Sequence, residues 1–372
     1  MSLHRTIWIA LIAAVLAGCQ STAPSATSGG APTSTPAQTG VESPSAPASP
    51  SGSTGPLPSA PAVKILVDTD VAPDDLVAIA FLVAAPNVEI AAITVSGTGE
   101  VHCPRGVSIV LGLLERLHAP DIPVACGSDR PIALDHAFPA LFRDNADAAA
   151  GLDLPTTARS GASGDAVALI TTTAAADAGN LRILTLGPLT NLAQAMAGTP
   201  SLAKTIESVY VMGGAVDVAG NVAGSPEAPA DNTTAEWNIY VDPAAAAAVL
   251  DSGSRVRFVS LDGTNQVPVT PAFGQRVATS ASGAPLAVLA ELLAKNDYMT
   301  SGGYYLWDTV AAIAAAGYPV GDFADVRLSV DTTDGPASGR TSRGDGPTNA
   351  SYMSRADPAT IEGLIVDVMN RD

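Results

Sequence analysis

The run at residues 65–76, ILVDTDVAPDDL, restricts the fold more than any other part of the sequence. An apolar strand carries Asp68 and Asp70 at its end, and a Pro-Asp-Asp helix start follows. Side chains alternate sides along a strand, so Asp68 and Asp70 are expected to point the same way. Proline at the first helical position places Asp74 and Asp75 in the first turn. We therefore expect four carboxylates to converge at a strand-to-helix junction.

Such a cluster of acids repels itself unless a cation lies inside it. Ligands that are all oxygen suit a hard cation such as Ca²⁺ or Mg²⁺. A simpler interpretation is that acids at a helix start complement the helix dipole, which would explain Asp74 and Asp75. It does not explain Asp68 and Asp70, so the pattern favours a metal-binding or catalytic role.

Residues 1–19 have the organisation of a bacterial lipoprotein signal. A short basic start precedes the apolar residues 7–17, and the segment ends Leu-Ala-Gly-Cys at Cys19. This is typical of a secretory signal peptide and is too short for a membrane-spanning helix. The small residues predict cleavage before Cys19 and lipidation of its thiol; an ordinary signal peptide with an incidental cysteine is the alternative. We therefore expect an extracytoplasmic protein that contacts the bacterial cell membrane through its lipid anchor only.

Residues 20–62 are nearly all Ser, Thr, Pro, Ala and Gly, which predicts a disordered tether. The single charge there, Glu42, is cancelled by Arg5 in the signal segment, so the net charge of −18 belongs to the remaining chain. Strong acidity disfavours polyanionic partners, and we expect no nucleic-acid binding.

Residues 63–372 contain no second linker and are expected to form one domain. Strand-like runs alternate with helical stretches rich in Ala and Leu. This alternation predicts an α/β fold with a Rossmann-like core, in which helices cover both faces of an open, mostly parallel central sheet. The expected strands are 63–67, 88–95, 181–186, 208–212 and 256–261. The expected helices are 74–84, 105–117, 165–178, 189–197, 243–250, 286–296, 309–316 and 358–369.

Two cysteines remain once Cys19 is assigned to lipid. An oxidising location permits a disulfide between Cys103 and Cys126, but the sequence favours the unbonded state. The pair lacks metal-ligand spacing, and His102 beside it is expected to be structural.

Later segments place further polar groups where a ligand could lie. The Gly187-Pro188 turn after a strand exposes backbone carbonyls, and the glycines that follow Met212 permit close approach of a ligand. An extended backbone at 236–238 would point Glu236 and Asn238 the same way, toward paired hydroxyls. Asp308 adds one more carboxylate at a helix start.

These segments, in this order, resemble the calcium-dependent nucleoside hydrolases of the inosine-uridine-preferring superfamily. The resemblance rests on DTDVAPDD at 68–75, GPLTN at 187–191, MGG at 212–214 and EWNIYVDP at 236–243. It covers nearly all of residues 63–372 and implies an N-glycosyl hydrolase that releases base and ribose from ribonucleosides. The implied partner is a small-molecule nucleoside, and a homodimer or homotetramer is compatible with the resemblance.

The resemblance also implies roles for individual residues. Ca²⁺ would be bound by Asp70, Asp75, the main-chain carbonyl of Leu186 and Asp308, together with two ribose hydroxyls and a water. Asp70 would be the general base, and surrounding carboxylates would stabilise an oxocarbenium-like transition state. Contacts with the substrate would come from Asp74, Asn221, Glu236, Asn238, Met212, Thr98 and Trp307; Asn232 is the alternative to Asn221.

Two departures from the family pattern bear on the substrate. The segment SGTG at 96–99 puts Thr98 near the place of a sugar-binding Asn, which weakens or changes one contact. Trp307 stands where inosine-uridine-preferring members have a His that protonates the leaving base. A Trp at this position resembles the purine-specific branch, in which stacking of the base on indole replaces that acid. Such an activity would fit purine salvage. The alternative is that Trp307 is only an aromatic residue of the core. Candidates for the opposite stacking face are Phe138 and Phe142.

Two other functions stay open. A lipoprotein could bind nucleosides for a transporter without cleaving them, although such a receptor has no need of a cation site with a base beside it. The opening acids also resemble phosphatases of the haloacid dehalogenase type, but the downstream Lys of that pattern has no counterpart here.

Overall fold

The structure, a computed structural model, describes residues 60–371 except Ser163 and Pro226. The lipoprotein signal, the lipidation site at Cys19 and nearly all of the tether lie outside the described residues and stay predictions. The described chain enters at the amino end of the first strand, where Asn87 Nδ2 donates a hydrogen bond to the Pro61 carbonyl at 2.8 Å.

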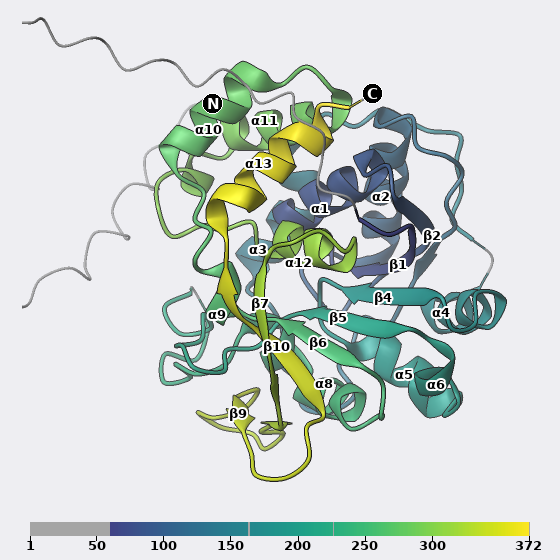
Figure 1. Cartoon of the computed structure of the whole chain (residues 1–372), viewed down its shortest axis with the longest axis vertical. Coiled ribbons are helices and arrows are strands. Elements are labelled where there is room, and N and C mark those ends of the chain that lie inside the picture. The colour runs from purple at the N-terminus through teal and green to yellow at the C-terminus, as the bar shows by residue number, and fades with distance from the viewer. Residues whose placement is uncertain (1–59, 163, 226, 372) are drawn as a thin grey trace, which may run out of the picture. The chain divides into compact units, whose positions relative to one another are not determined.

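The fold is built on one eight-stranded sheet with the order β3-β2-β1-β4-β5-β6-β10-β7 (Figure 1). All neighbouring strands are parallel except β7, which is antiparallel to β10. The predicted α/β class with a mostly parallel sheet is therefore confirmed. The strands are β1 Val63–Thr69, β2 Val88–Val95, β3 Val124–Cys126, β4 Leu181–Thr185, β5 Ser208–Met212, β6 Val256–Val259, β7 Gly321–Val326 and β10 Ala350–Ala356, and a separate ribbon pairs β8 Leu328–Val330 with β9 Thr341–Arg343.

Helices cover both faces of the sheet, and each face has its own apolar core. The first face carries α1 Pro73–Ala84, α2 Cys103–Arg116, α10 Pro271–Ser280, α11 Ala284–Lys295, α12 Trp307–Ala315 and α13 Pro358–Met369. The second face carries α4 Ala166–Ala176, α5 Thr190–Gly198 and α8 Pro243–Leu250. Shorter helices are α3 Ala140–Asp147, α6 Leu202–Thr205, α7 Trp237–Val241 and α9 Leu261–Thr264.

Burial explains the composition of the central elements. Residues 65–67 of β1 are inaccessible to solvent, since helices pack on both faces of this strand. Residues 76–82 of α1 are also almost fully buried, because α11, α12 and α13 pack against α1 in addition to the sheet. Both segments are therefore continuous apolar sequences rather than amphipathic ones.

The carboxyl ends of β1, β2, β4 and β5 meet at one edge of the sheet. Loops from these ends carry most of the predicted site residues, as expected for an open α/β sheet. In the part of the chain that the structure describes, no helix has the length and apolar character needed to cross a bilayer.

Candidate active site

Three carboxylates from two helices form the centre of the site. Asp74 and Asp75 lie in the first turn of α1, and Asp308 lies in the first turn of α12. One carboxylate oxygen from each residue lies within 4.8 Å of the other two. All three residues are at most 4% exposed. The packing of α12 against α1 thus joins two helix starts into one buried acidic cluster.

In the described part of the chain, no basic side chain forms an ion pair with this cluster. Burial, and then repulsion from Asp74 and Asp75, raises the pKa of Asp308 well above its ordinary value. Burial followed by repulsion from Asp75 raises the pKa of Asp74 to about 6. Among the described residues, Oδ1 of Asp308 is buried without a hydrogen-bond partner. Buried like charges with an unpartnered oxygen fit a hard divalent cation.

Asp70 lies beside the acidic cluster, at the turn between β1 and α1. Its Oδ2 accepts a hydrogen bond from the Glu100 amide at 3.1 Å. Burial raises the pKa of Asp70 well above its ordinary value, and the negative charges of Asp75 and Glu100 add to the effect. Glycines provide the space for this side chain, since a Cβ at Gly99 or Gly187 would lie 2.2 or 2.7 Å from the Asp70 Cβ. The raised pKa makes Asp70 a stronger base than an ordinary aspartate.

The backbone is strained directly after Asp70. Val71 has φ of 62°, a left-handed conformation that β-branched residues rarely adopt. The Val71 amide donates to Thr69 Oγ1 at 3.0 Å, and the Val101 amide donates to the Asp70 carbonyl at 3.1 Å. The Thr69 hydroxyl also donates to Asp75. This bonded turn holds Asp70 and the start of α1 in one rigid unit.

Asp68 is not one of the three clustered carboxylates, and it is bonded to polar neighbours on β2 and α5. Its Oδ1 accepts hydrogen bonds from Thr94 Oγ1 at 2.7 Å and Asn191 Nδ2 at 2.8 Å. Burial raises the pKa of Asp68 to about 7, although these two hydrogen bonds act in the opposite direction. Asp68 therefore ties the ends of two strands to α5.

Asn238 connects the ends of β4 and β5. Its Nδ2 donates to the Leu186 carbonyl at 2.7 Å and the Met212 carbonyl at 3.2 Å. The Leu186 carbonyl, which the sequence suggested as a metal ligand, thus already accepts one hydrogen bond. It keeps a second lone pair, and the next residue, Gly187, packs against Asp70.

The extended backbone predicted at 236–238 is wrong, because α7 begins there. Glu236 caps this helix by accepting hydrogen bonds from the amides of Asn238 at 3.0 Å and Ile239 at 3.2 Å. It also accepts from the Gly214 amide at 3.1 Å. Burial raises the pKa of Glu236 to about 7, and these amides act against that rise. A helix cap rather than strand alternation therefore orients Glu236 and Asn238.

The two candidate asparagines differ in how they are used. Asn232 is fully buried, donates to the Ser338 carbonyl at 2.8 Å and accepts from the Ala235 amide at 3.1 Å. Asn221 accepts from the Trp237 amide at 3.1 Å, next to Glu236. Over residues 60–371, apart from the two gaps, its Nδ2 has no protein acceptor. This arrangement favours Asn221 over Asn232 as a ligand-binding residue.

Aromatic rings border the acidic cluster at the start of α12. Trp307 is partly exposed, and its Nε1 donates to Asn265 Oδ1 at 3.0 Å. The rings of Tyr304 and Tyr305 lie 5.0 and 5.3 Å from it, centroid to centroid. The Tyr304 hydroxyl donates to Asp74 Oδ1 at 3.0 Å, which links the rings to the acids. A fixed, partly exposed indole beside buried carboxylates offers a stacking surface.

Comparison with known proteins decides the family. The family model described as inosine-uridine preferring nucleoside hydrolase matches residues 65–362. The chain belongs to this nucleoside hydrolase family. The family and the solved neighbours are ribonucleoside hydrolases, so the chain falls in a class of N-glycosyl hydrolases.

Individual relatives agree with this assignment. The pyrimidine-specific ribonucleoside hydrolase RihA of Salmonella schwarzengrund is 35% identical over 236 residues, which are 62% of this chain and 70% of RihA. The uncharacterized protein C1683.06c of Schizosaccharomyces pombe is 34% identical over 206 residues, 55% of this chain and 63% of the relative. The fold is similar to that of a plant nucleoside hydrolase, PpNRh1, with a TM-score of 0.74 and 26% identity over 84% of this chain and 100% of the other.

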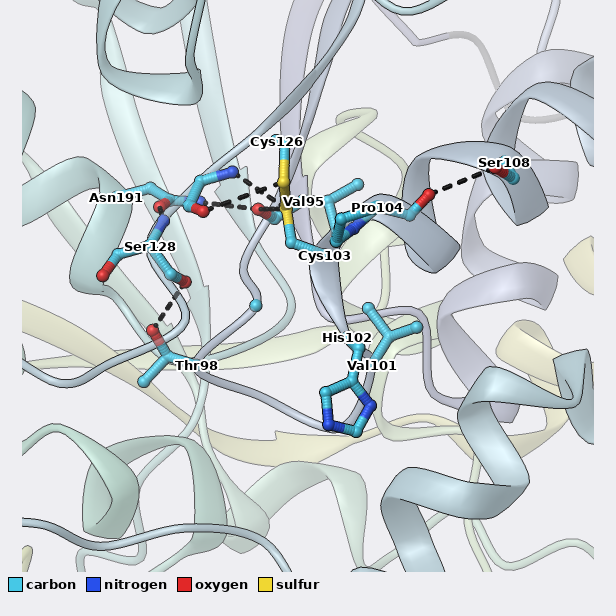
Figure 2. Close-up of a disulfide and its surroundings, with 12 residues drawn as sticks. Val95, Thr98, Val101, His102, Cys103, Pro104, Ser108, Cys126, Ser128 and Asn191 are labelled. Carbon is cyan, nitrogen blue, oxygen red and sulfur yellow. Dashed lines mark hydrogen bonds between the residues drawn. A yellow bond between two sulfur atoms is a disulfide. The ribbon is translucent and has the colours of Figure 1, made fainter.

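A disulfide holds the loop after β2 beside the nucleoside hydrolase site (Figure 2). Cys103 and Cys126 are bonded with their Cα atoms 5.5 Å apart, so the prediction of unbonded cysteines is wrong. The error arose because the pairing of β3 with β2, which brings Cys126 to the start of α2, was not predicted. In the same loop, Thr98 Oγ1 donates to the Ser128 carbonyl at 3.1 Å, so this hydroxyl is already used within the protein.

Arg143 of α3 holds the same loop from another side. Its guanidinium donates to the carbonyls of Gly97 at 3.2 Å, Val101 at 3.4 Å and Gly99. Burial and then the charges of the acidic cluster raise the pKa of the neighbouring Glu100 to about 8, and Arg143 opposes that rise. A guanidinium and a disulfide thus fix the loop whose amide contacts Asp70.

The phenylalanines suggested as a second stacking face lie against another ring. Phe138 stacks on Trp237 with centroids 5.0 Å apart, and Phe142 meets the edge of the same indole at 6.1 Å. Their contacts are therefore with Trp237 in α7, next to Glu236, rather than with Trp307.

Four residues of the nucleoside hydrolase site were missed in the sequence. Tyr304 and Glu100 each lie within four residues of a recognised segment, so proximity could have indicated them. Asn191 belongs to the GPLTN run, but its partner Asp68 comes from a distant strand. No sequence pattern indicated Arg143, because α3 was not predicted and because Arg143 donates its hydrogen bonds to backbone carbonyls.

Proposed function

We propose that this chain hydrolyses the N-glycosidic bond of ribonucleosides, preferably purine ribonucleosides, to free base and ribose. Family membership supports the reaction class. The observation that carries the proposal is the buried acidic cluster of Asp74, Asp75 and Asp308 with Asp70 beside it. A protein that only bound nucleosides would have no use for a basic carboxylate at such a cluster.

The cluster residues suit a cation, and we propose Ca²⁺, bound by Asp70, Asp75, Asp308 and the Leu186 carbonyl. The bound ion would lower the pKa of the attacking water. Asp70, which lies beside the acidic cluster and receives one amide hydrogen bond, would accept the proton of that water. The remaining carboxylates would stabilise positive charge as the glycosidic bond breaks.

Ribose would bind where α7 and the loops after β4 and β5 meet. Asn238 and Glu236 are fixed there by hydrogen bonds to backbone groups, so little freedom would be lost when hydroxyls bind. Asp74 is oriented by Tyr304 and the Asp308 amide. Asn221 and Met212 would complete this sugar site. Thr98 would also contact the sugar, but its hydroxyl hydrogen already bonds to the Ser128 carbonyl.

Trp307 supports the purine preference. No histidine takes its place at the start of α12, and its ring is fixed by Asn265 and two tyrosines. Stacking on indole would favour protonation of a purine leaving group without a side-chain acid. The similarity to the pyrimidine-specific RihA points the other way, so the decisive assay includes both base classes.

The assay incubates the full-length protein with inosine, adenosine, guanosine, uridine and cytidine and measures released ribose. We expect release from the purine nucleosides at least tenfold faster than from the pyrimidine nucleosides. The reverse order would replace the purine proposal by a RihA-like activity. Binding of every nucleoside without ribose release would reject hydrolysis altogether, and phosphate release from nucleotides would indicate a phosphatase.

The metal is tested on the Asp75→Ala variant by calorimetry and elemental analysis. We expect one tightly bound Ca²⁺ per chain in the parent and none in the variant, because Asp75 is the carboxylate that touches both Asp70 and Asp308. Asp121→Ala, at an exposed site, is the matched control and should keep the ion. A parent protein without tightly held calcium would contradict the proposed site.

We also propose that the protein acts outside the cytoplasm, anchored by lipid at Cys19. The Cys103–Cys126 disulfide supports this location, because disulfides persist mainly in oxidising compartments.

A further inference from the structure

A cavity of about 690 Å³ lies at the edge of the sheet opposite the acidic cluster. It is formed by the amino ends of β6 and β10, the end of β7 and the loop before β6. Its volume falls in the range of small-molecule sites in proteins. Three arginines line it, Arg255, Arg257 and Arg327, with two aspartates, Asp251 and Asp325. This is an unusual concentration of guanidinium groups in a chain of net charge −18.

Arg257 is placed by the register of the sheet. It pairs with Tyr210 of β5 and Ser351 of β10, and Ser351 pairs in turn with Asp325 of β7. Paired residues point to the same face, so these four side chains form one row across the strands. The Arg257 guanidinium lies 4.3 Å from the ring centroid of Phe323 and 5.4 Å from that of Tyr210. The two rings therefore restrict the position of this guanidinium.

The Nε donor of Arg257 lacks an acceptor in the part of the chain that the structure describes. Within residues 60–371, apart from the two gaps, its Nε is buried and has no hydrogen-bond acceptor. A buried donor without an acceptor costs about 1–3 kcal/mol, and more when it is charged. Such a group on the wall of a cavity indicates that something else supplies the acceptor.

The other two arginines are also weakly compensated. Arg327 Nη2 lies 3.6 Å from Asp251 Oδ1, too far for a hydrogen bond. No carboxylate of the described chain lies within 4.0 Å of the Arg255 or Arg257 guanidinium. Positive charge therefore exceeds negative charge at this wall, whereas buried acids outnumber the one guanidinium, Arg143, at the catalytic edge.

We infer that this cavity is a second ligand site, which binds a small molecule bearing a phosphate group. A guanidinium offers parallel N–H donors that match two phosphate oxygens, and an arginine already packed against rings loses little freedom on binding. The cavity is larger than one phosphate, so the ligand would extend beyond that group. This site is independent of the proposed hydrolysis, since the strongly acidic catalytic edge would repel such an anion.

The test titrates inorganic phosphate into the full-length protein in buffer without added calcium and at constant ionic strength. Calorimetry gives the affinity, and ¹⁵N spectra of the arginine Nε–Hε groups locate the site. The Arg257 signal is assigned by its absence in Arg257→Lys. We expect binding of one phosphate, a shift of the Arg257 signal and at least a tenfold loss of affinity in Arg257→Gln.

Three further variants make the result specific. Arg255→Gln removes an exposed guanidinium at the cavity, so it reports on binding even if Arg257→Gln folds poorly, and it should also weaken binding. Arg276→Gln removes the same charge from α10, away from the cavity, and should bind as the parent does. Arg257→Lys keeps the charge without the planar donors and should bind more weakly than the parent. Equal affinity in all variants, or an Arg257 signal that phosphate does not move, would overturn the inference.

Discussion

The chemistry of the site depends on single carboxylates whose environments differ. Asp68 is held by two side-chain donors, whereas Asp70 receives one amide hydrogen bond and faces other acids. Both are buried, so the contrast arises from neighbours and not from exposure. The acidic neighbours of Asp70 therefore add to the rise in its pKa that burial causes, whereas the two donors to Asp68 oppose the rise there.

Replacement of Asp70 by Asn tests the proposed base. The amide has the same shape but cannot accept the proton of the attacking water, so we expect kcat to fall by ~10²–10⁴-fold. Turnover of inosine and the thermal unfolding midpoint are measured together. Asp121→Asn serves as the control, and a kcat within threefold of the parent would remove Asp70 from the role of base.

Replacement of Trp307 by Ala tests how the base leaves. If indole stacking activates a purine, kcat should fall much more on inosine than on p-nitrophenyl riboside, whose leaving group needs no proton. Trp307→Phe, which keeps a stacking ring, should recover part of the loss on inosine. Equal losses on both substrates would reduce Trp307 to a packing residue.

At the scale of single residues, the sequence predicted site residues that lie in recognisable sequence motifs. It missed site residues whose role depends on one contact with a distant part of the chain. Asp74, Asp75 and Asp308 each begin a helix, and helix starts are visible in sequence. The hydrogen bond from Tyr304 to Asp74 joins residues 230 positions apart, and no local pattern encodes it.

At the scale of elements, the apolar central strands were predictable, whereas the edge strand β7 and its inner neighbour β10 were not. β1, β2, β4, β5 and β6 are apolar and lie inside the sheet. β7 is mostly exposed and β10 is rich in polar residues, so neither shows the continuous apolar run of a central strand. α7 has only five residues after its Glu236 cap, which is too short for helical periodicity to appear.

Loss of the disulfide, which joins the start of α2 to β3, should lower the stability of the fold. Cys103 and Cys126 enclose a loop of separation 23, for which chain entropy predicts about 3 kcal/mol of stability. We expect the Cys103→Ala/Cys126→Ala variant to unfold at lower urea concentration by about that free energy. Reductant should shift the parent in the same way and leave the variant unchanged. Unchanged urea midpoints in both experiments would show that the bond adds no stability.

At the scale of the whole molecule, the predicted anchor decides where the enzyme works. If Cys19 carries lipid, the parent should sediment with membranes and partition into detergent, and Cys19→Ser should appear in the soluble extracytoplasmic fraction. Fractionation with an antibody to the folded domain measures both. Membrane association that persists in Cys19→Ser would require a different attachment.

The point where the described chain enters the sheet has a practical consequence. Pro61 lies at the amino end of β1, and the acids lie at the carboxyl ends of the same set of strands. A bead, electrode or reporter joined upstream of residue 60 would therefore attach to the domain on the side away from the reacting groups. Immobilisation through the N-terminus would leave diffusion of nucleosides to the catalytic edge unobstructed, whereas coupling through loops after β1 or β4 would not.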